Sequence, residues 1–525
     1  MKFKKIYALL LLTSLLSPLY GVSLRYAQKL TNYHSFRYLY SMSQSQDKTY
    51  FATDNGAIVY SHIFRCWERP MNYPQGLLDK NIKTIYYHPA TGYLWAAADQ
   101  ALYVLFGDAA FQWEKIDFFG TCRRIGSDNN RLFAETYSQV LELDPYTGSV
   151  IHPVNPENFS ITWSVSSIKM DLYQVQFTGQ YFIDVDGSSV VESAFRKYPI
   201  SFSVYGNNQN LWMGTLGNGL YTGDRSTLFV QHMPYGLLNN NVTRCDVFGN
   251  KVFIGHGIDY KGPDDRNGWT ETHTEFQNFR WIDEDDVPVL GNQTVRGFLY
   301  YQDTLLVITD HSIIVERPQK NDFMTITPGV GLINTVQDVV QCDTMAWIIA
   351  ESGIFKINIK ELSISPVLDI PIQIQTAIFM DGYLYLGSHF GILVYEVSDS
   401  STLIFKKDFI NVYYGVQNLA ENGKNIFWSD DFSIRKADPY LNNLTTLPVT
   451  DLRRGIYIND IACDTAYIWV GTNQGLFSFN LATEQTEHIT MNEGLCSNRI
   501  QTLEISDNIL YIGTDQGLTR YEIND

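Results

Sequence analysis

A short alternation of hydrophobic and polar positions recurs along the chain. It is clearest from Tyr467 to Phe479, where Tyr-Ile-Trp-Val is followed by Gly-Thr-Asn-Gln-Gly and then by Leu-Phe-Ser-Phe. About forty residues later the pattern returns from Leu510 to Tyr521. Aromatic and β-branched residues that alternate and then stop at a glycine are typical of a half-buried strand ending in a tight turn. Gly475 and Gly517 suit such a turn because glycine adopts a positive φ at no steric cost.

Each repeat unit contains room for four short strands. Two further alternating segments, residues 484–490 and 500–505, separate the copy at Tyr467 from the copy at Leu510. No window keeps an apolar stripe at helical spacing through the glycines, so a helical interpretation fails. Four short antiparallel strands in about forty residues are typical of a β-propeller blade.

The copies can be counted by the residue at the position of Trp469. Successive markers lie 38 to 44 residues apart, except for one step of 53 residues between Phe253 and Leu306. Twelve copies are too many for one ordinary ring, so we expect an all-β protein of tandem β-propellers with about twelve four-stranded blades. Two six-bladed rings are favoured, and seven plus five blades or a nested arrangement is the alternative. The markers are Phe51, Trp95, Phe133, Tyr173, Trp212, Phe253, Leu306, Trp347, Tyr385, Phe427, Trp469 and Tyr511, of which those at Phe133, Tyr173 and Phe427 depend mostly on spacing.

The long step suggests where one ring ends. It predicts a first propeller over residues 22–270 and a second over 271–525. We expect the segment 23–30 to complete blade six and seal the first ring. The strand 273–281 would complete blade twelve and seal the second, with the insert 261–268 as the crossing between the rings.

Residues 1–21 are expected to be a secretory signal peptide. Lys2, Lys4 and Lys5 form a positive region, and residues 6–16 form an apolar run that is short for a membrane span. An uncleaved anchor is the alternative. No later hydrophobic run has spanning length, so we expect no transmembrane span in the mature chain and a periplasmic or extracellular location.

The charge balance narrows the range of partners. The chain carries 38 basic and 56 acidic residues, a formal charge of −18. Such a surface is a poor partner for nucleic acid or anionic lipid. A hydrophobic content of 45%, with 14% aromatic residues, is ample for packed cores.

The repeat resembles a known family. A Gly-Leu-x-x-Asn loop ending at Asn498 leads into an alternating strand and then into a strand-turn unit close to Leu-Trp-Ile-Gly-Thr-x-x-Gly-Leu. Related loops begin at Gly76 and Gly236, each with its Asn one position later. The pattern resembles the two-component regulator propeller repeat of periplasmic sensor domains and, more loosely, the propeller portion of surface proteins tied to type nine secretion. The copies that match the strand half best are those at Trp212, Trp469 and Tyr511.

This resemblance implies an exported propeller that binds a ligand or a protein partner. Because the chain stops at Asp525, the resemblance implies a sensor-like protein without a signalling output domain of its own. One alternative is a carbohydrate-active enzyme, a glycosidase or lyase, which would need two carboxylates flanking a sugar. A second alternative is a structural envelope or secretion-associated component.

Motifs for catalysis and metal binding are missing from the sequence. There is no Gly-x-Ser-x-Gly, no His-Glu-x-x-His and no Cys-x-x-Cys pair among the six cysteines. We therefore predict a non-enzymatic protein with no cofactor, no metal and no catalytic residues. The cysteines, expected to be buried thiols, are Cys66, Cys122, Cys245, Cys342, Cys463 and Cys496.

A few residues are candidates for ligand contact. His311 and His389 occupy the turn that elsewhere carries Asn473 or Asp515, as His256 also nearly does. A turn residue is the simpler interpretation of each histidine. Asn241 and Asn498 fall at the entrance to an inner strand, where a cap of the loop is the simpler role. Trp269 could stack on a sugar or simply pack; the five binding candidates are His311, His389, Asn241, Asn498 and Trp269.

An acidic stretch lies near the long step. Asp264, Asp265 and Asn267 are followed by the run Asp283-Glu-Asp-Asp286. Clustered oxygens suit calcium, but Pro263 stands where an EF-hand would place its first aspartate. A solvated linker is the simpler interpretation.

Overall fold

A computed structural model gives the fold of this chain. It describes residue 26 and residues 28–523 except 108–111, 119, 193–195, 208, 258–265, 318–321, 327–334, 352, 369–371, 399–402, 410–414, 431–432 and 450–454. The expected signal peptide lies outside the described residues. Within the described part of the chain, no helix is both long and apolar enough to cross a membrane.

The protein is all-β and is built as tandem β-propellers from small, mostly antiparallel sheets. Contacts within the chain separate two compact units. The first consists of residues 1–32, 36–233 and 491–495, and the second of residues 33–35, 234–490 and 496–525. The boundary expected between residues 270 and 271 falls inside a strand of the second unit.

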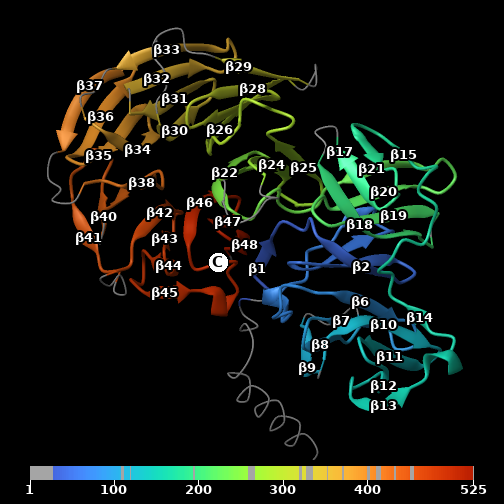
Figure 1. Cartoon of the computed structure of the whole chain (residues 1–525). Helices are drawn as coiled ribbons and strands as arrows, with labels where there is room; N and C mark the ends of the chain where they lie inside the picture. The colour runs from blue at the N-terminus through green and yellow to red at the C-terminus, as the bar shows by residue number, and fades with distance from the viewer. Residues whose placement is uncertain are drawn as a thin grey trace, which may run out of the picture. The chain divides into compact units, whose positions relative to one another are not determined.

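The second unit contains seven four-stranded sheets among the described residues. The first strand of each sheet packs beside the first strand of the next, and β46 returns to β22, so these sheets close a ring. Figure 1 shows them following one another from green β22 to red β48. The strands are β22 (Val242–Phe248), β23 (Lys251–His256), β24 (Gly268–His273) and β25 (Phe279–Asp283); β26 (Val295–Tyr301), β27 (Thr304–Thr309), β28 (Ile313–Arg317) and β29 (Asp322–Ile326); β30 (Val336–Cys342), β31 (Met345–Ala350), β32 (Gly353–Asn358) and β33 (Ser363–Leu368); β34 (Ile374–Met380), β35 (Tyr383–Ser388), β36 (Gly391–Val397) and β37 (Leu403–Phe409); β38 (Asn418–Glu421), β39 (Ile426–Ser429), β40 (Ile434–Ala437) and β41 (Thr445–Leu447); β42 (Ile458–Cys463), β43 (Tyr467–Thr472), β44 (Gly475–Asn480) and β45 (Thr486–Ile489); and β46 (Ile500–Ser506), β47 (Ile509–Thr514) and β48 (Gly517–Glu522) with β1 (Leu30–Tyr33).

The first unit contains four sheets among its described residues, two of them with extra strands. The expected division into six and six blades therefore differs from the seven and four sheets seen here. Three short 3₁₀ helices, η1 (Tyr73–Gln75), η2 (Pro156–Asn158) and η3 (Met491–Glu493), lie in connections. The strands are β2 (Leu39–Gln44), β3 (Lys48–Thr53), β4 (Gly56–Ser61) and β5 (Cys66–Trp67); β6 (Thr84–His88), β7 (Tyr93–Ala97), β8 (Ala101–Leu105) and β9 (Glu114–Asp117); β10 (Cys122–Asp128), β11 (Arg131–Thr136), β12 (Val140–Leu143), β13 (Val150–Val154) and β14 (Thr162–Trp163); and β15 (Gln176–Phe177), β16 (Tyr181–Ile183), β17 (Ser189–Glu192), β18 (Lys197–Tyr205), β19 (Asn210–Thr215), β20 (Leu220–Asp224) and β21 (Phe229–Met233).

The repeat marker identifies the second strand of a sheet. Eleven of the twelve marker residues lie in such strands, and all eleven are buried. This strand is flanked by a neighbour on each side and packs on both faces, so it selects large apolar residues. The marker at Tyr173 is wrong: it lies outside the strands, and its side chain is 74% exposed.

The N-terminal strand closes a different sheet from the one expected. β1 pairs with β48 and supplies the fourth strand of the last blade, as Figure 1 shows with blue β1 beside red β48. The Tyr33 ring stacks on Phe276 with centroids 4.2 Å apart. The His34 ring nitrogen Nδ1 lies 2.7 Å from the carbonyl oxygen of Gln516, and the ring donates this bond because a carbonyl can only accept. Segments from the two ends of the chain thus seal the second ring.

The segment after the long step also has a different role from the one expected. The region 273–281 runs from the end of β24 into β25, which pairs with β24 rather than with the last blade. Most of the insert 261–268 lies outside the described residues. Since β23 and β24 on either side of it belong to one sheet, the insert connects two strands of a single blade.

A segment of the first unit crosses its inner strands. Residues 162–169 bond in turn to the inner strands β10, β6, β2 and β18. The Ser164 N–H donates to the Ile125 carbonyl at 2.8 Å, and the Ser164 and Thr84 hydroxyls lie 2.8 Å apart. Val165 exchanges two backbone hydrogen bonds of 2.9 Å with Met42, and the Lys169 N–H donates to the carbonyl of Ser203 at 2.8 Å. This segment therefore links the four inner strands, although five of its eight residues are exposed.

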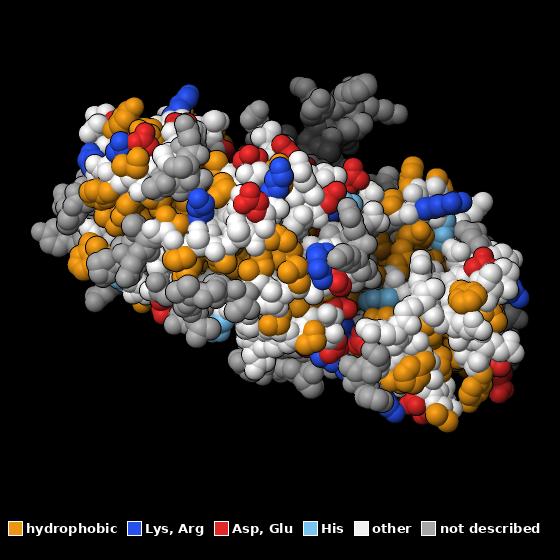
Figure 2. Space-filling model, turned by 90° about the horizontal axis from the view of Figure 1, so that it is seen from above, with side chains coloured by type: hydrophobic (Ala, Val, Ile, Leu, Met, Phe, Trp, Pro, Cys, Tyr) orange, Lys and Arg blue, Asp and Glu red, His pale blue; other side chains and the backbone are white. Residues whose placement is uncertain are grey.

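Eight of the ten tryptophan side chains are buried. Figure 2 shows one face of the molecule, on which hydrophobic side chains form separate groups among polar and charged ones. The largest fully buried side chains include those of Trp95, Trp212, Trp269, Trp347 and Trp428.

Candidate functional site

Polar side chains from several blades lie at the end of the second unit's ring where each inner strand begins. We call this end the entrance. Each inner strand begins at the same end as the turn between the second and third strands, as the pairing of Val242 with His256 shows. Asn241 lies just before β22, and its carboxamide oxygen accepts a 2.6 Å hydrogen bond from Gln501 Nε2 on β46. Asn241 also takes part in its own loop, since its N–H donates to the side-chain oxygen of Asn239 at 3.0 Å. It therefore caps the loop and links two neighbouring blades.

The two candidate histidines lie at this end of the ring but in different blades. His311 follows β27, is exposed, and donates its backbone N–H to Gln293 Oε1 at 3.1 Å. His389 follows β35, is exposed, and accepts a 3.1 Å hydrogen bond from Gln375 Nε2. Each histidine is thus held by a glutamine of its own blade. Asn498 is half-buried in the loop that precedes β46.

Two other candidates lie away from the entrance or inside a blade. Trp269, considered as a sugar-stacking residue, is fully buried in β24 and packs edge-on against Phe323. That interpretation is wrong, because no face of its ring reaches solvent. His256 is also fully buried, with Nε2 2.8 Å from the Thr270 hydroxyl oxygen.

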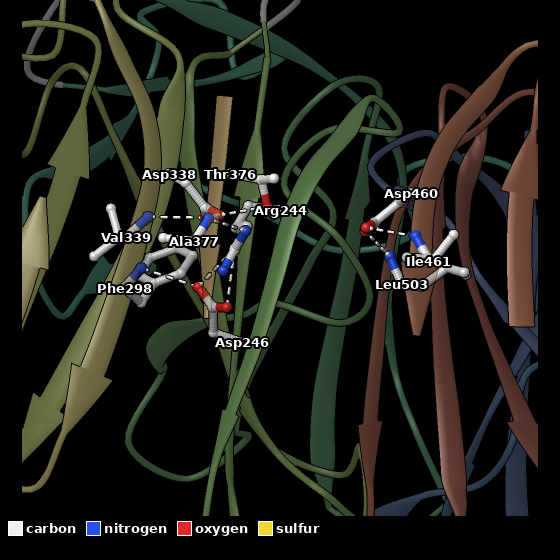
Figure 3. Close-up of polar contacts among 10 residues, drawn as sticks. All are labelled: Arg244, Asp246, Phe298, Asp338, Val339, Thr376, Ala377, Asp460, Ile461 and Leu503. Atoms are coloured by element: carbon white, nitrogen blue, oxygen red, sulfur yellow. Dashed lines mark hydrogen bonds and ion pairs between the residues drawn. The ribbon is translucent and has the colours of Figure 1, made fainter. Parts of the chain in front are cut away.

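Just inside the entrance, an arginine is held between two aspartates. Arg244 on β22 bonds through Nε to both carboxylate oxygens of Asp246, at 2.9 and 3.1 Å. Its Nη1 lies 3.6 Å from Asp338 Oδ1 on β30. Figure 3 shows the Arg244 side chain between these two aspartates. The Arg244 side chain remains 29% exposed, so water reaches it.

The carboxylates also connect neighbouring inner strands. Asp246 Oδ2 accepts the Phe298 N–H of β26 at 2.9 Å. Asp338 Oδ2 accepts the Ala377 N–H of β34 at 2.9 Å, and its Oδ1 accepts the Val339 N–H at 2.8 Å. Hydrogen bonds to a charged acceptor are stronger than neutral ones, so these contacts join blades that have no strand pairing between them.

Asp460 repeats the arrangement on the opposite side of the ring. Its Oδ2 accepts the Leu503 N–H of β46 at 2.7 Å, and its Oδ1 accepts the Ile461 N–H at 2.8 Å. In Figure 3 it points toward β46 from its own strand, apart from the group around Arg244. Asp338 and Asp460 occupy equivalent positions, because each directly follows the register shift at the start of its inner strand.

Burial and mutual repulsion favour the protonated form of several of these acids. Burial and the charge of Asp246 raise the pKa of Glu504 on β46 to about 8. Burial raises the pKa of Asp460 to about 6, although hydrogen bonds from Leu503 and Ile461 and the charge of Arg244 oppose the rise. Burial also raises the pKa of Asp246, against the attraction of Arg244. Burial opposes the charge of Arg244, but the carboxylates of Asp246 and Asp338 outweigh it, and the pKa of Arg244 lies above its usual value.

Chemically, this cluster offers one guanidinium and several carboxylates around a water-accessible centre. Among the described residues, no group of three or more His, Cys, Asp or Glu side chains is arranged to hold a metal ion. The backbone hydrogen bonds fix the aspartates in place, so the cluster presents a rigid polar surface to anything that enters the ring.

The sequence analysis did not identify this cluster. Arg244, Asp246, Asp338, Asp460 and Glu504 interrupt inner strands that are otherwise largely apolar. A charged residue at the same position of several copies is the signal that could have revealed them. Their convergence on one centre follows only from closure of the ring.

Comparison with solved structures identifies the class of fold. PorZ, described as an essential bacterial surface component of the type IX secretion system of Porphyromonas gingivalis, is similar to this chain with a TM-score of 0.51 at 12% identity, over 94% of this chain and 86% of PorZ. The extracellular domains of two putative hybrid two-component systems of B. thetaiotaomicron give TM-scores of 0.40 and 0.44 at 17% and 13% identity. They cover 93% and 91% of this chain and 75% and 73% of those domains.

PorZ belongs to one of the two kinds of protein that the repeat resembles, and its similarity to this chain at 12% identity shows a shared fold. No protein-family model matches the chain, and no curated protein matches it by sequence.

Proposed function

We propose that this protein is an exported β-propeller protein that binds a ligand or protein partner at the entrance of its second ring. The observation that carries the proposal is the contrast between the two units. In the first unit, residues 162–169 bond to four inner strands. In the second, the equivalent strands carry charged side chains such as that of Arg244, which is 29% exposed.

The composition of the entrance supports binding. Amide and imidazole groups lie at the same end of the ring. The amides belong to Asn241 and Gln501 in two neighbouring blades, and the imidazoles to His311 and His389 in turns of other blades. A few polar groups held in fixed positions are what a binding site uses to orient a ligand. The periplasmic or extracellular location rests on the expected signal peptide and on the resemblance to exported propellers.

The specific observation that favours a carbohydrate-active enzyme is the raised pKa of Glu504, because a general acid must hold its proton near neutral pH. Against this, Asp246 and Asp460 use their oxygens to accept hydrogen bonds from the backbone and from Arg244. Binding without catalysis is therefore the function that we propose. Hydrolysis of aryl glycosides that is lost in Glu504→Gln would favour the enzyme instead.

Saturation-transfer NMR on the full-length protein tests the proposal. The panel contains neutral and anionic oligosaccharides and uncharged dipeptides, and each is measured with the wild type and with Gln501→Arg, which places a bulky charge at the entrance. We expect at least one member of the panel to bind the wild type and to lose its signal in the variant. A panel that does not bind, or a signal that Gln501→Arg leaves unchanged, would contradict the proposed site.

A further inference from the structure

Four Asn-Gly pairs occur in the chain, and one of them has different surroundings from the other three. A glycine after asparagine leaves its backbone nitrogen open to attack the asparagine side chain, because it has no Cβ to block the approach. Asn55, Asn218 and Asn267 are buried, with exposed fractions of 8%, 0% and 2%. Asn422 is only partly buried, and Gly423 after it is exposed, in the turn between β38 and β39.

At the three buried pairs, the groups that would react are held by neutral carbonyls. The Gly56 N–H donates to the Lys80 carbonyl at 2.7 Å, and the Gly219 N–H donates to another backbone carbonyl at 2.8 Å. Asn267 Nδ2 donates to the Gly291 carbonyl at 3.1 Å. A carbonyl oxygen accepts a hydrogen bond but is a far weaker base than a carboxylate, so these contacts restrain the groups without activating them.

At Asn422 the neighbouring groups favour the same attack. The Gly423 N–H donates to Glu421 Oε2 at 2.5 Å, so a carboxylate lies within reach of the proton that must leave the nitrogen. The Asn422 side-chain oxygen accepts the N–H groups of Lys424 and Asn425, at 3.3 and 3.0 Å. Such donors stabilise the negative charge that develops on the oxygen when its carbon is attacked. One turn therefore supplies both a base and an oxyanion site.

We propose that Asn422 is a site of spontaneous self-modification, at which the chain converts this asparagine to aspartate or isoaspartate. The Gly423 nitrogen attacks Cγ of Asn422 while its proton passes to the Glu421 carboxylate, and a succinimide ring forms. The bond from Cγ to Nδ2 breaks, and ammonia leaves with that proton. Water then opens the ring at one of its carbonyls, so water is the only reagent consumed and nothing is oxidised or reduced.

The conversion changes a contact between two blades. Asn422 Nδ2 donates to the Asp464 carbonyl at 3.3 Å, and Asp464 lies in the turn between β42 and β43 of the next blade. A carboxylate has no proton to donate to that carbonyl, so the modified chain loses this contact. This inference goes beyond the proposed function, because the turn after β38 lies at the other end of that inner strand from the entrance.

Peptide mapping by mass spectrometry tests the proposal on the full-length protein during incubation near neutral pH. Conversion adds about 1 Da, and we expect it at Asn422 at least about tenfold faster than at the three buried pairs. Glu421→Gln keeps the size of the side chain but cannot take the proton. It should slow conversion about tenfold, which is less than a base contributes in an enzyme because water also reaches this turn. The matched control is Glu361→Gln, in the exposed turn between β32 and β33, which should leave the rate unchanged.

Either of two results would overturn the proposed site. Conversion that is no faster at Asn422 than at the buried pairs would show that the turn does not promote the attack. An unchanged rate in a folded Glu421→Gln variant would show that exposure alone sets the rate. Asn422→Asp mimics one product and should speed hydrogen exchange of the Ala466 and Tyr467 amides, which bond to Asp464 Oδ1, about threefold. Unchanged exchange in this variant would overturn the effect on the contact between blades.

Discussion

The replacement Asp338→Ala tests whether carboxylates hold neighbouring blades of the second ring together. The Asp338 carboxylate accepts the N–H groups of Val339 and Ala377 and the Thr376 hydroxyl, at 2.8, 2.9 and 3.2 Å, and forms an ion pair with Arg244. Its side chain is only 15% exposed. Alanine would leave these three donors without their acceptor and Arg244 with Asp246 alone, at a cost of about 3 to 5 kcal/mol. Asn keeps one acceptor oxygen, so Asp338→Asn should cost about half as much.

Hydrogen exchange is the suitable assay, because two units need not unfold in one transition. In Asp338→Ala, the amides of Val339 and Ala377 should exchange faster by a factor of roughly 10² to 5 × 10³, as expected for a loss of this size. Glu361→Ala, at an exposed turn between β32 and β33, is the control and should change stability by less than about 0.5 kcal/mol. If Asp338→Ala behaves like Glu361→Ala, the carboxylate does not join the blades and the reasoning fails.

Three further predictions follow from other parts of the molecule. Burial and the charge of Asp246 raise the pKa of Glu504 from its usual 4.5 to about 8, so the folded protein holds this proton where the unfolded chain releases it, and stability should fall as pH rises between these values. Glu504→Gln should flatten this fall in denaturant titrations, and an unchanged slope would contradict the prediction. Tyr33→Ala removes a buried ring stacked on Phe276 and should destabilise the last blade by about 3 kcal/mol. Hydrogen exchange of the β48 amides should then be faster, and unaltered exchange would argue against closure of the second ring by β1. Trp212→Ala should lower the free energy of unfolding by about 3 to 5 kcal/mol, because its side chain is buried, and Tyr173→Ala, at an exposed side chain, by less than about 0.5 kcal/mol. Chemical unfolding measures both, and similar losses would contradict the assignment of strands.

The blades could be predicted because their signal is local. Segments such as Tyr467–Thr472 alternate and stop at a glycine turn, and their central residue is buried whichever blade comes next. Tyr173 misled the count because spacing placed it, and because Gly179 follows it at the same distance as Gly475 follows Trp469. Closure of the ring could not be predicted in the same way, because β1 and β48 pair across almost the whole chain.

The candidate site was predicted only in part. The structure places Asn241, His311 and His389 at one end of the ring, and their contact with a ligand stays a prediction. Trp269 was misassigned because one sequence does not show which face of a strand is covered. Arg244 was missed because its role depends on acids contributed by other blades, which closure alone brings together.

The central claim is that the entrance of the second ring binds a ligand or partner. Hydrogen exchange of the full-length protein, with and without the tightest-binding member of the oligosaccharide and dipeptide panel, tests it most directly. The account predicts slower exchange in residues 239–241, 293–296 and 498–501, and no change in residues 162–169 of the first unit. Slower exchange confined to the first unit, or no change anywhere, would contradict the account.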